Sequence, residues 1–197
     1  MLDIIIIILI VAISFDTTLF LQSQISQPIF SCILIGLLVD NIGLGIYIGT
    51  VSQFIASSYL PVGGNNIPDL QLSSNLFILV FASEQISFDL VGQIFPFVII
   101  LSIIFMYVTV IERKILTRYI KKIPYEKIEL PFMISYSLVI HLILTVIAVV
   151  LFYYILNYYK TDILEHTVYE PLRVLVFIIF FSMGNLAIRY YRRGFRH

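Results

Sequence analysis

The sequence predicts an all-α integral membrane protein with several transmembrane helices, and three observations lead to this prediction. Of the 197 residues, 60% are hydrophobic and only 12% are charged, whereas a soluble domain is about 45–50% apolar and about 25% charged. The mean hydropathy is +1.01. Apolar runs recur along the chain, and about 20 apolar residues suffice for a helix to cross a bilayer. We expect one membrane-embedded domain over 1–197, with broken or re-entrant segments in its first half, 1–111.

Basic residues are concentrated in the second half of the chain. No Lys or Arg precedes Glu112, after which one basic group occupies 113–127 and another the C-terminal tail. Because loops rich in Lys and Arg stay in the cytoplasm, we expect the 112–127 loop, part of a basic loop over 112–130, and the C terminus to be cytoplasmic. Two spans in 131–197, over 131–156 and 171–190, satisfy that placement. The formal net charge is zero, which offers no basis for nucleic-acid binding.

The apolar segments of the first half are short and interrupted by polar residues. Residues 2–15 lack the basic start and the cleavage site of a signal peptide, so we expect a retained first segment. Pro28 is well suited to begin the next helix. Asp40 breaks that segment, and for it, as for Asp16, we expect a role in capping a helix end.

Close helix packing and further interruptions are expected after Asp40. Gly45 and Gly49 have the spacing that lets two membrane helices approach closely. The apolar segment 76–82 is too short to cross a bilayer as a helix. Glu84 and Asp89 interrupt it before the span 90–111, and we interpret them as part of a surface loop in preference to a polar path.

The polar stretch after Thr50 is the candidate functional region. Irregular backbone between apolar segments is tolerated at membrane depth only where it is buried in protein or lines a watery cavity, and such interruptions are typical of transporter substrate sites. A carboxylate in a membrane is costly and therefore suggests function, which makes Asp69 a candidate. The alternative is that Asn65, Asn66 and Asp69 form an exposed turn, for which these residue types are suited.

The side chains of this stretch are suited to binding a sugar. Sugar hydroxyls both donate and accept hydrogen bonds, as amides do, and hydrogen bonds to a carboxylate are stronger than neutral ones. Gln53, Asn65, Asn66 and Asp69 supply such groups, and Tyr59 offers a flat face to a sugar ring.

Sequence motifs for catalysis and metal binding are missing. The chain has no P-loop, G-x-S-x-G or Cys-x-x-Cys motif. Its three histidines lack metal-ligand spacing, and we interpret His141 as a packing residue in preference to a ligand or proton carrier. Cys32, the only cysteine, is expected to be a small buried hydrophobe. We therefore expect no metal, no cofactor and no catalytic residue in this chain.

Residues 27–75 resemble the first half of the membrane-embedded IIC component of mannose/sorbose-type sugar phosphotransferase systems. An ordered series without gaps carries this resemblance: Gln27-Pro28, Cys32, the apolar run 34–38, Asp40, the glycines at 43, 45 and 49, Ile55-Ala56, Tyr59, Val62-Gly63 and Pro68-Asp69. The family's Pro-Asp falls on Pro68-Asp69, its preceding polar residues fall near Asn65-Asn66, and its Glu falls on Gln53.

The resemblance implies a sugar permease subunit in the bacterial inner membrane that pairs with a IID-type membrane subunit. Oligomers of such pairs translocate the sugar, which a cytoplasmic IIB protein, charged by IIA, phosphorylates. This chain departs from the family pattern at Gln27, where a basic residue is usual, at Gln53, and in ending at His197. A non-transporting docking or regulatory subunit with the same fold is therefore the alternative, and a secondary transporter coupled to protons through Asp69 or Glu84 is a weaker one.

Overall fold

The computed structural model describes residues 2–14, 25–58, 68–85, 88–121 and 130–166, and the regular structure in these ranges is entirely α-helical. Six helices follow one another: α1 (Leu2–Ser14), α2 (Pro28–Leu38), α3 (Ile42–Ser58), α4 (Leu70–Val80), α5 (Phe88–Ile120) and α6 (Leu130–His166). The prediction of an all-α membrane protein is confirmed.

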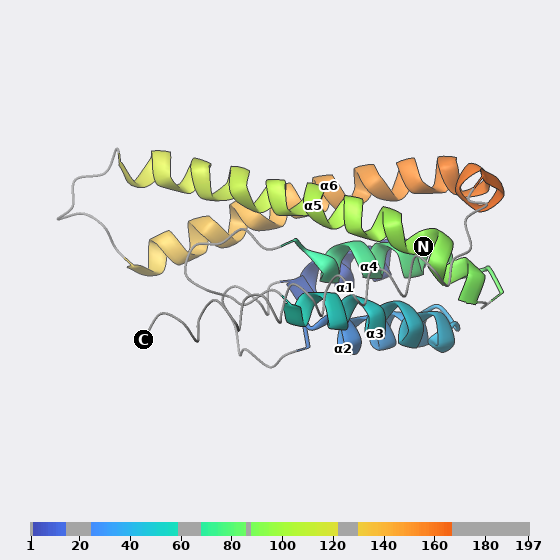
Figure 1. Ribbon diagram of the computed structural model, residues 1–197. Helices are drawn as coiled ribbons and strands as arrows, with labels where there is room; N and C mark the ends of the chain where they lie inside the picture. Colours follow the sequence, from blue (N-terminus) through green and yellow to red (C-terminus); the bar gives the residue numbers. More distant parts are fainter. Residues whose placement is uncertain (1, 15–24, 59–67, 86–87, 122–129, 167–197) are drawn as a thin grey trace, which may run out of the picture.

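The helices α5 and α6 are long and apolar enough to cross a membrane. They contain 33 and 37 residues, which at about 1.5 Å per residue exceeds the roughly 30 Å of the hydrocarbon core. Figure 1 shows them antiparallel, with one end of the pair projecting beyond the shorter helices. Large apolar side chains on their outer faces are exposed, as lipid contact requires; among them are Ile100, Ile103, Val139 and Ile147.

The first half of the chain consists of shorter helices, as the prediction of broken segments requires. The helices α1, α2, α3 and α4 contain 13, 11, 17 and 11 residues, fewer than the roughly 20 that a straight span needs. The α3 helix continues through Ser58, so the beginning of the polar stretch is helical.

Both long helices extend beyond the predicted spans. Residues 112–120 of the predicted basic loop are helical and continue α5, and α6 continues past residue 156 to His166. Neither extension contains Gly or Pro, the residues that most strongly oppose a helix, and α5 ends with Arg118 in its last turn, where a cation stabilises the helix dipole. The predicted span 171–190 lies outside the described residues.

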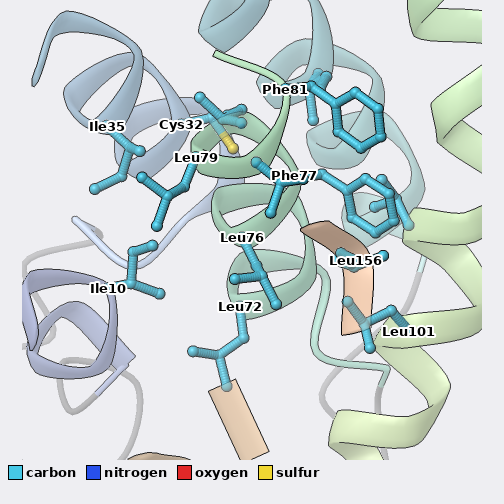
Figure 2. Packing of buried hydrophobic residues seen from close by; sticks show 14 of the residues in the cluster. Ile10, Cys32, Ile35, Leu72, Leu76, Phe77, Leu79, Phe81, Leu101 and Leu156 are labelled. Atoms are coloured by element: carbon cyan, nitrogen blue, oxygen red, sulfur yellow. The ribbon is translucent and has the colours of Figure 1, made fainter. Parts of the chain in front are cut away.

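The short helix α4 forms the centre of the molecule. All of its residues are buried. Figure 2 shows Leu72, Leu76 and Phe77 of α4 among side chains of the surrounding helices, including Ile10 of α1, Cys32 and Ile35 of α2, Leu101 of α5 and Leu156 of α6. Cys32 has no exposed surface, which confirms its predicted role as a buried hydrophobe.

Three glycines bring α2 and α3 into backbone contact. A Cβ added to Gly45 would lie 2.5 Å from the carbonyl oxygen of Cys32, and one added to Gly49 would lie 2.8 Å from the Cys32 Cβ. A Cβ on Gly36 would lie 3.0 Å from the Gly45 Cα. The predicted close approach at Gly45 and Gly49 is therefore confirmed.

The turn between α2 and α3 is closed by backbone hydrogen bonds and an asparagine. The Asn41 N–H donates to the Gly36 carbonyl at 2.8 Å and the Asp40 N–H to the Leu37 carbonyl at 3.4 Å, the pattern of a Schellman helix end. Asp40 occupies the left-handed position of this motif, with φ of 57°.

The side chain of Asn41 connects this turn to the end of α4. Its Oδ1 accepts from the Leu44 N–H at 3.2 Å, and its Nδ2 donates to the carbonyls of Ala82 at 2.8 Å and Glu84 at 3.2 Å. The side-chain capping predicted for Asp40 is therefore performed by Asn41, because Asp40 occupies the left-handed position one residue earlier. Asp16, for which capping was also predicted, lies outside the described residues.

Replacing Asp40 by valine is expected to lower the free energy of unfolding by about 1–2 kcal/mol, because a β-branched residue opposes the left-handed conformation. Asp40→Gly is expected to keep or raise stability. Thermal unfolding can be followed with a thiol-reactive dye, since Cys32 is the only cysteine and is fully buried. Equal unfolding temperatures for the two variants would contradict this assignment.

Candidate functional site

The structure describes two of the five residues predicted to contact a sugar. Gln53 lies on α3 and Asp69 directly precedes α4. The other three, Tyr59, Asn65 and Asn66, lie outside the described residues.

Asp69 forms the N-cap of α4. Its Oδ1 accepts a hydrogen bond from the Leu72 N–H at 3.0 Å, which satisfies one of the free donors at the helix start. Its own N–H donates to the Ser102 carbonyl on α5 at 3.0 Å. Asp69 is half-buried. The cap uses one acceptor site of the carboxylate, and an ionised carboxylate offers about four.

The contact between α3 and α4 is polar in the middle of an apolar bundle. The hydroxyls of Ser52 and Ser74, both without exposed surface, lie 2.6 Å apart. Next to Ser52, the Gln53 Oε1 has no hydrogen-bond partner among the described residues. The same holds on α4 for the Gln71 Nε2 and for both polar atoms of Asn75.

These unpaired amides are energetically expensive. Gln71 is 5% exposed and Asn75 is 0% exposed, so bulk water does not solvate them. A buried polar group without a hydrogen bond costs about 1–3 kcal/mol, and native structures contain only a few such groups. Two of them, Gln71 and Asn75, lie one turn apart on the same helix, which is typical of a site that binds something polar.

The prediction from the sequence did not include Gln71 and Asn75. The two amides are one helical turn apart, and residues at i and i+4 share a face of a helix. That spacing was visible in the segment 71–75. The sequence did not show that these amides are buried, because only the tertiary structure buries every side of α4.

A second polar cluster joins α1, α5 and α6 through residues that are far apart in the sequence. The His141 Nδ1 lies 2.8 Å from the Glu112 Oε2, and the His141 Nε2 lies 3.3 Å from the Ser14 Oγ. The Ser137 hydroxyl donates to the Glu112 Oε1 at 3.5 Å. His141 thus has partners at both nitrogens, as expected of a packing residue.

Glu112, the first residue of the predicted basic loop, lies within α5 and is only 9% exposed. The reason is its partner: a buried charge is tolerated where it is paired and hydrogen-bonded, and His141 on the antiparallel helix α6 provides that pairing.

The hydrogen-bond directions define where the protons of this cluster lie. The Ser14 hydroxyl donates to the Val11 carbonyl at 2.6 Å, so its oxygen accepts from His141 and the Nε2 carries hydrogen. The Nδ1–Oε2 contact then holds one further proton, either on an imidazolium facing a carboxylate or on a carboxylic acid facing a neutral ring. In either arrangement, the described part of the cluster connects α1, α5 and α6 as a clamp.

Glu84 lies in the turn after α4 and takes part in a surface ion pair. The Lys160 Nζ on α6 lies 2.8 Å from the Glu84 Oε1. The same Nζ donates to the Ser83 hydroxyl at 2.8 Å. This agrees with the interpretation of Glu84 as part of a surface loop. The side chain of Asp89 lies outside the described residues.

Groups of acidic, His or Cys side chains that could hold a metal ion are not found among the described residues. The arrangement at α3 and α4 instead provides neutral hydrogen-bonding groups and one carboxylate. Such a set can bind and orient a polar molecule, and the part of the site that the structure describes contains no activated nucleophile.

Comparison with known proteins provides one match. A family model described as the sorbose-specific IIC component of the PTS system matches residues 1–181 of the chain. The searches of curated proteins and of solved structures found no match to the chain.

Proposed function

The chain belongs to the family of sorbose-specific IIC components of the phosphotransferase system, and on this premise we propose that it is the sugar-translocating subunit of such a system, paired with a IID-type partner. Membership establishes it as a membrane component of a sugar-specific phosphotransferase system. The finer proposal includes IIB and IIA proteins as phosphoryl donors to the incoming sugar, and an oligomer of IIC–IID pairs.

The observation that carries this proposal is the polar contact between α3 and α4. It lies in an apolar bundle, includes the unpaired Gln53 Oε1 and adjoins the Asp69 cap of α4. Intramembrane polar groups of this kind line substrate paths in transporters. We propose Gln53, Asn65, Asn66 and Asp69 as sugar contacts and Tyr59 as a stacking face.

We propose that the bacterial inner membrane holds this subunit with its basic α5 end in the cytoplasm. Arg113, Lys114, Arg118 and Lys121 lie on one side of that end, beyond the apolar part of the helix. The positive-inside tendency favours the cytoplasm for such a cluster. Because α5 and α6 are antiparallel, the Glu84–Lys160 pair would then lie on the outer side.

The first experiment is a pull-down from native membranes in mild detergent, with partners identified by mass spectrometry. Recovery of a IID-like subunit, with IIB nearby, supports the permease. Recovery of the chain alone or with unrelated proteins favours the docking or regulatory alternative. Uptake that needs no phosphoryl donor and stops with a protonophore would instead identify a proton-coupled transporter.

Replacing Asp69 by asparagine is expected to weaken sugar binding roughly fivefold without loss of stability. Asparagine caps a helix as well as aspartate does, but a neutral hydrogen bond is about 1 kcal/mol weaker than one to a charged group. Binding is measured with radiolabelled sugars on the purified protein in lipid nanodiscs.

The control is Asp40→Asn, the same chemical change at an exposed residue whose left-handed backbone asparagine tolerates. It is expected to leave binding unchanged. Gln53→Ala provides a second test, with weaker binding and intact membrane insertion as the expected result. Loss of folded protein in both site variants would show that Asp69 and Gln53 are structural.

A further inference from the structure

We infer that Gln71 and Asn75 of α4 form a second part of the ligand site, which binds hydroxyl groups of an uncharged sugar. The inference rests on the proposed function, and it assigns to the site residues that lie C-terminal to the Asp69 cap. It starts from the four buried amide atoms of α3 and α4 that lack a hydrogen-bond partner among the described residues.

Three of these atoms belong to Gln71 and Asn75 of α4. Gln71, Ser74 and Asn75 share a side of α4, because positions i, i+3 and i+4 lie on one helix face. The Ser52–Ser74 hydrogen bond of 2.6 Å connects that side to α3. Gln53, whose Oε1 is the unpaired atom of α3, directly follows Ser52.

The chemistry of the unpaired atoms indicates what would bind. Two are donors, the Gln71 Nε2 and the Asn75 Nδ2, and two are acceptors, the Gln53 Oε1 and the Asn75 Oδ1. A metal ion would require acceptors only, and a phosphate would require donors only. A hydroxyl group both donates and accepts, so a neutral polyhydroxylated molecule matches the set.

A paired amide elsewhere in the chain shows the contrast. Asn41 is also buried, but it donates to two carbonyls, those of Ala82 and Glu84, and accepts the Leu44 N–H. Asn75, with less exposed surface than Asn41, has none of these contacts within the described part of the chain. Leucine should therefore be tolerated at Asn75 and not at Asn41.

The experiment compares Asn75→Leu, Gln71→Met and Asn41→Leu in the full chain, in nanodiscs with any subunit that co-purifies. Tritiated L-sorbose, D-mannose, D-fructose and D-glucose are the probes for binding. Dye reaction at Cys32 in the isolated chain reports the unfolding temperature. We expect Gln71→Met to bind sugar about fivefold more weakly, for one lost hydrogen bond, and Asn75→Leu about 25-fold more weakly, for two.

We also expect both site variants to unfold at or above the wild-type temperature without sugar, and Asn41→Leu to unfold below it. Unchanged sugar affinity in Asn75→Leu and Gln71→Met would overturn the inference. This is the result expected if a buried water, and not a sugar, occupies the site. An unfolding temperature of Asn75→Leu as low as that of Asn41→Leu would also overturn the inference, because it would show that the Asn75 amide is structural. A wild-type chain that binds none of the sugars would instead overturn the proposed function, and the inference with it.

Discussion

Replacing Glu112 by alanine is expected to lower the free energy of unfolding by about 3–5 kcal/mol, because this leaves His141 without its Nδ1 partner inside the bundle. The side chains of Glu112 and His141 are 11% and 9% exposed, and their contact of 2.8 Å joins the long helices α5 and α6. His141→Ala is expected to cost a similar amount, since it leaves the Glu112 Oε2 buried without its partner.

The double replacement Glu112→Leu with His141→Leu is expected to unfold near the wild-type temperature. Replacing both partners of a buried pair by apolar side chains removes the desolvation penalty together with the attraction. Dye reaction at Cys32 during heating measures all three variants, and the double variant shows whether the single losses come from the unpaired partner.

Glu84→Ala is the matched control for Glu112→Ala. Its pair with Lys160 has the same distance of 2.8 Å but is more exposed, with 33% of the Glu84 side chain accessible. Surface pairs contribute about 0–1 kcal/mol. A loss at Glu112 no larger than the loss at Glu84 would contradict the assignment of the cluster as a clamp.

Replacing Gly45 by leucine is expected to prevent α2 and α3 from packing and to leave little folded protein. Even the first carbon of the new side chain would lie 2.5 Å from the Cys32 carbonyl oxygen, and this atom belongs to the backbone and cannot rotate away. Gly45→Ala should therefore cost at least the roughly 1–3 kcal/mol typical of overpacking. Size-exclusion profiles after detergent extraction measure the folded fraction.

Ile46→Ala is the control for Gly45. Ile46 follows Gly45 on α3 but is 44% exposed, so its truncation removes surface contacts only and is expected to leave the profile unchanged. A Gly45→Leu variant that elutes and unfolds as the wild type does would show that α2 and α3 do not form this contact.

Much of the fold could be predicted because it depends on local composition. The apolar runs predicted an all-α membrane protein, and the spacing of Gly45 and Gly49 predicted a close helix contact. The ends of α5 and α6 were predicted less accurately. Residues 112–120 are rich in charge and were predicted as part of a basic loop. Their helix propensity and the burial of Glu112 against His141 continue α5.

The site was predictable only in part. The polar stretch pointed to Gln53 and Asp69, and the structure places one on α3 and the other at the cap of α4. Gln71 and Asn75 escaped prediction because an amide in a sequence does not show whether neighbouring elements pair it. Only a helix surrounded on all sides leaves such groups both buried and unpaired.

The sequence by itself determined that this chain lies in a membrane, because the free energy of transfer into lipid adds up residue by residue along a segment. The tertiary structure decided which polar groups are paired and which are left to bind a ligand. Pairing depends on residues far apart in the chain. Ser14 and His141 are 127 positions apart, yet the Ser14 Oγ lies 3.3 Å from the His141 Nε2. A hydrogen bond requires that proximity, and only the packing of α1, α5 and α6 provides it.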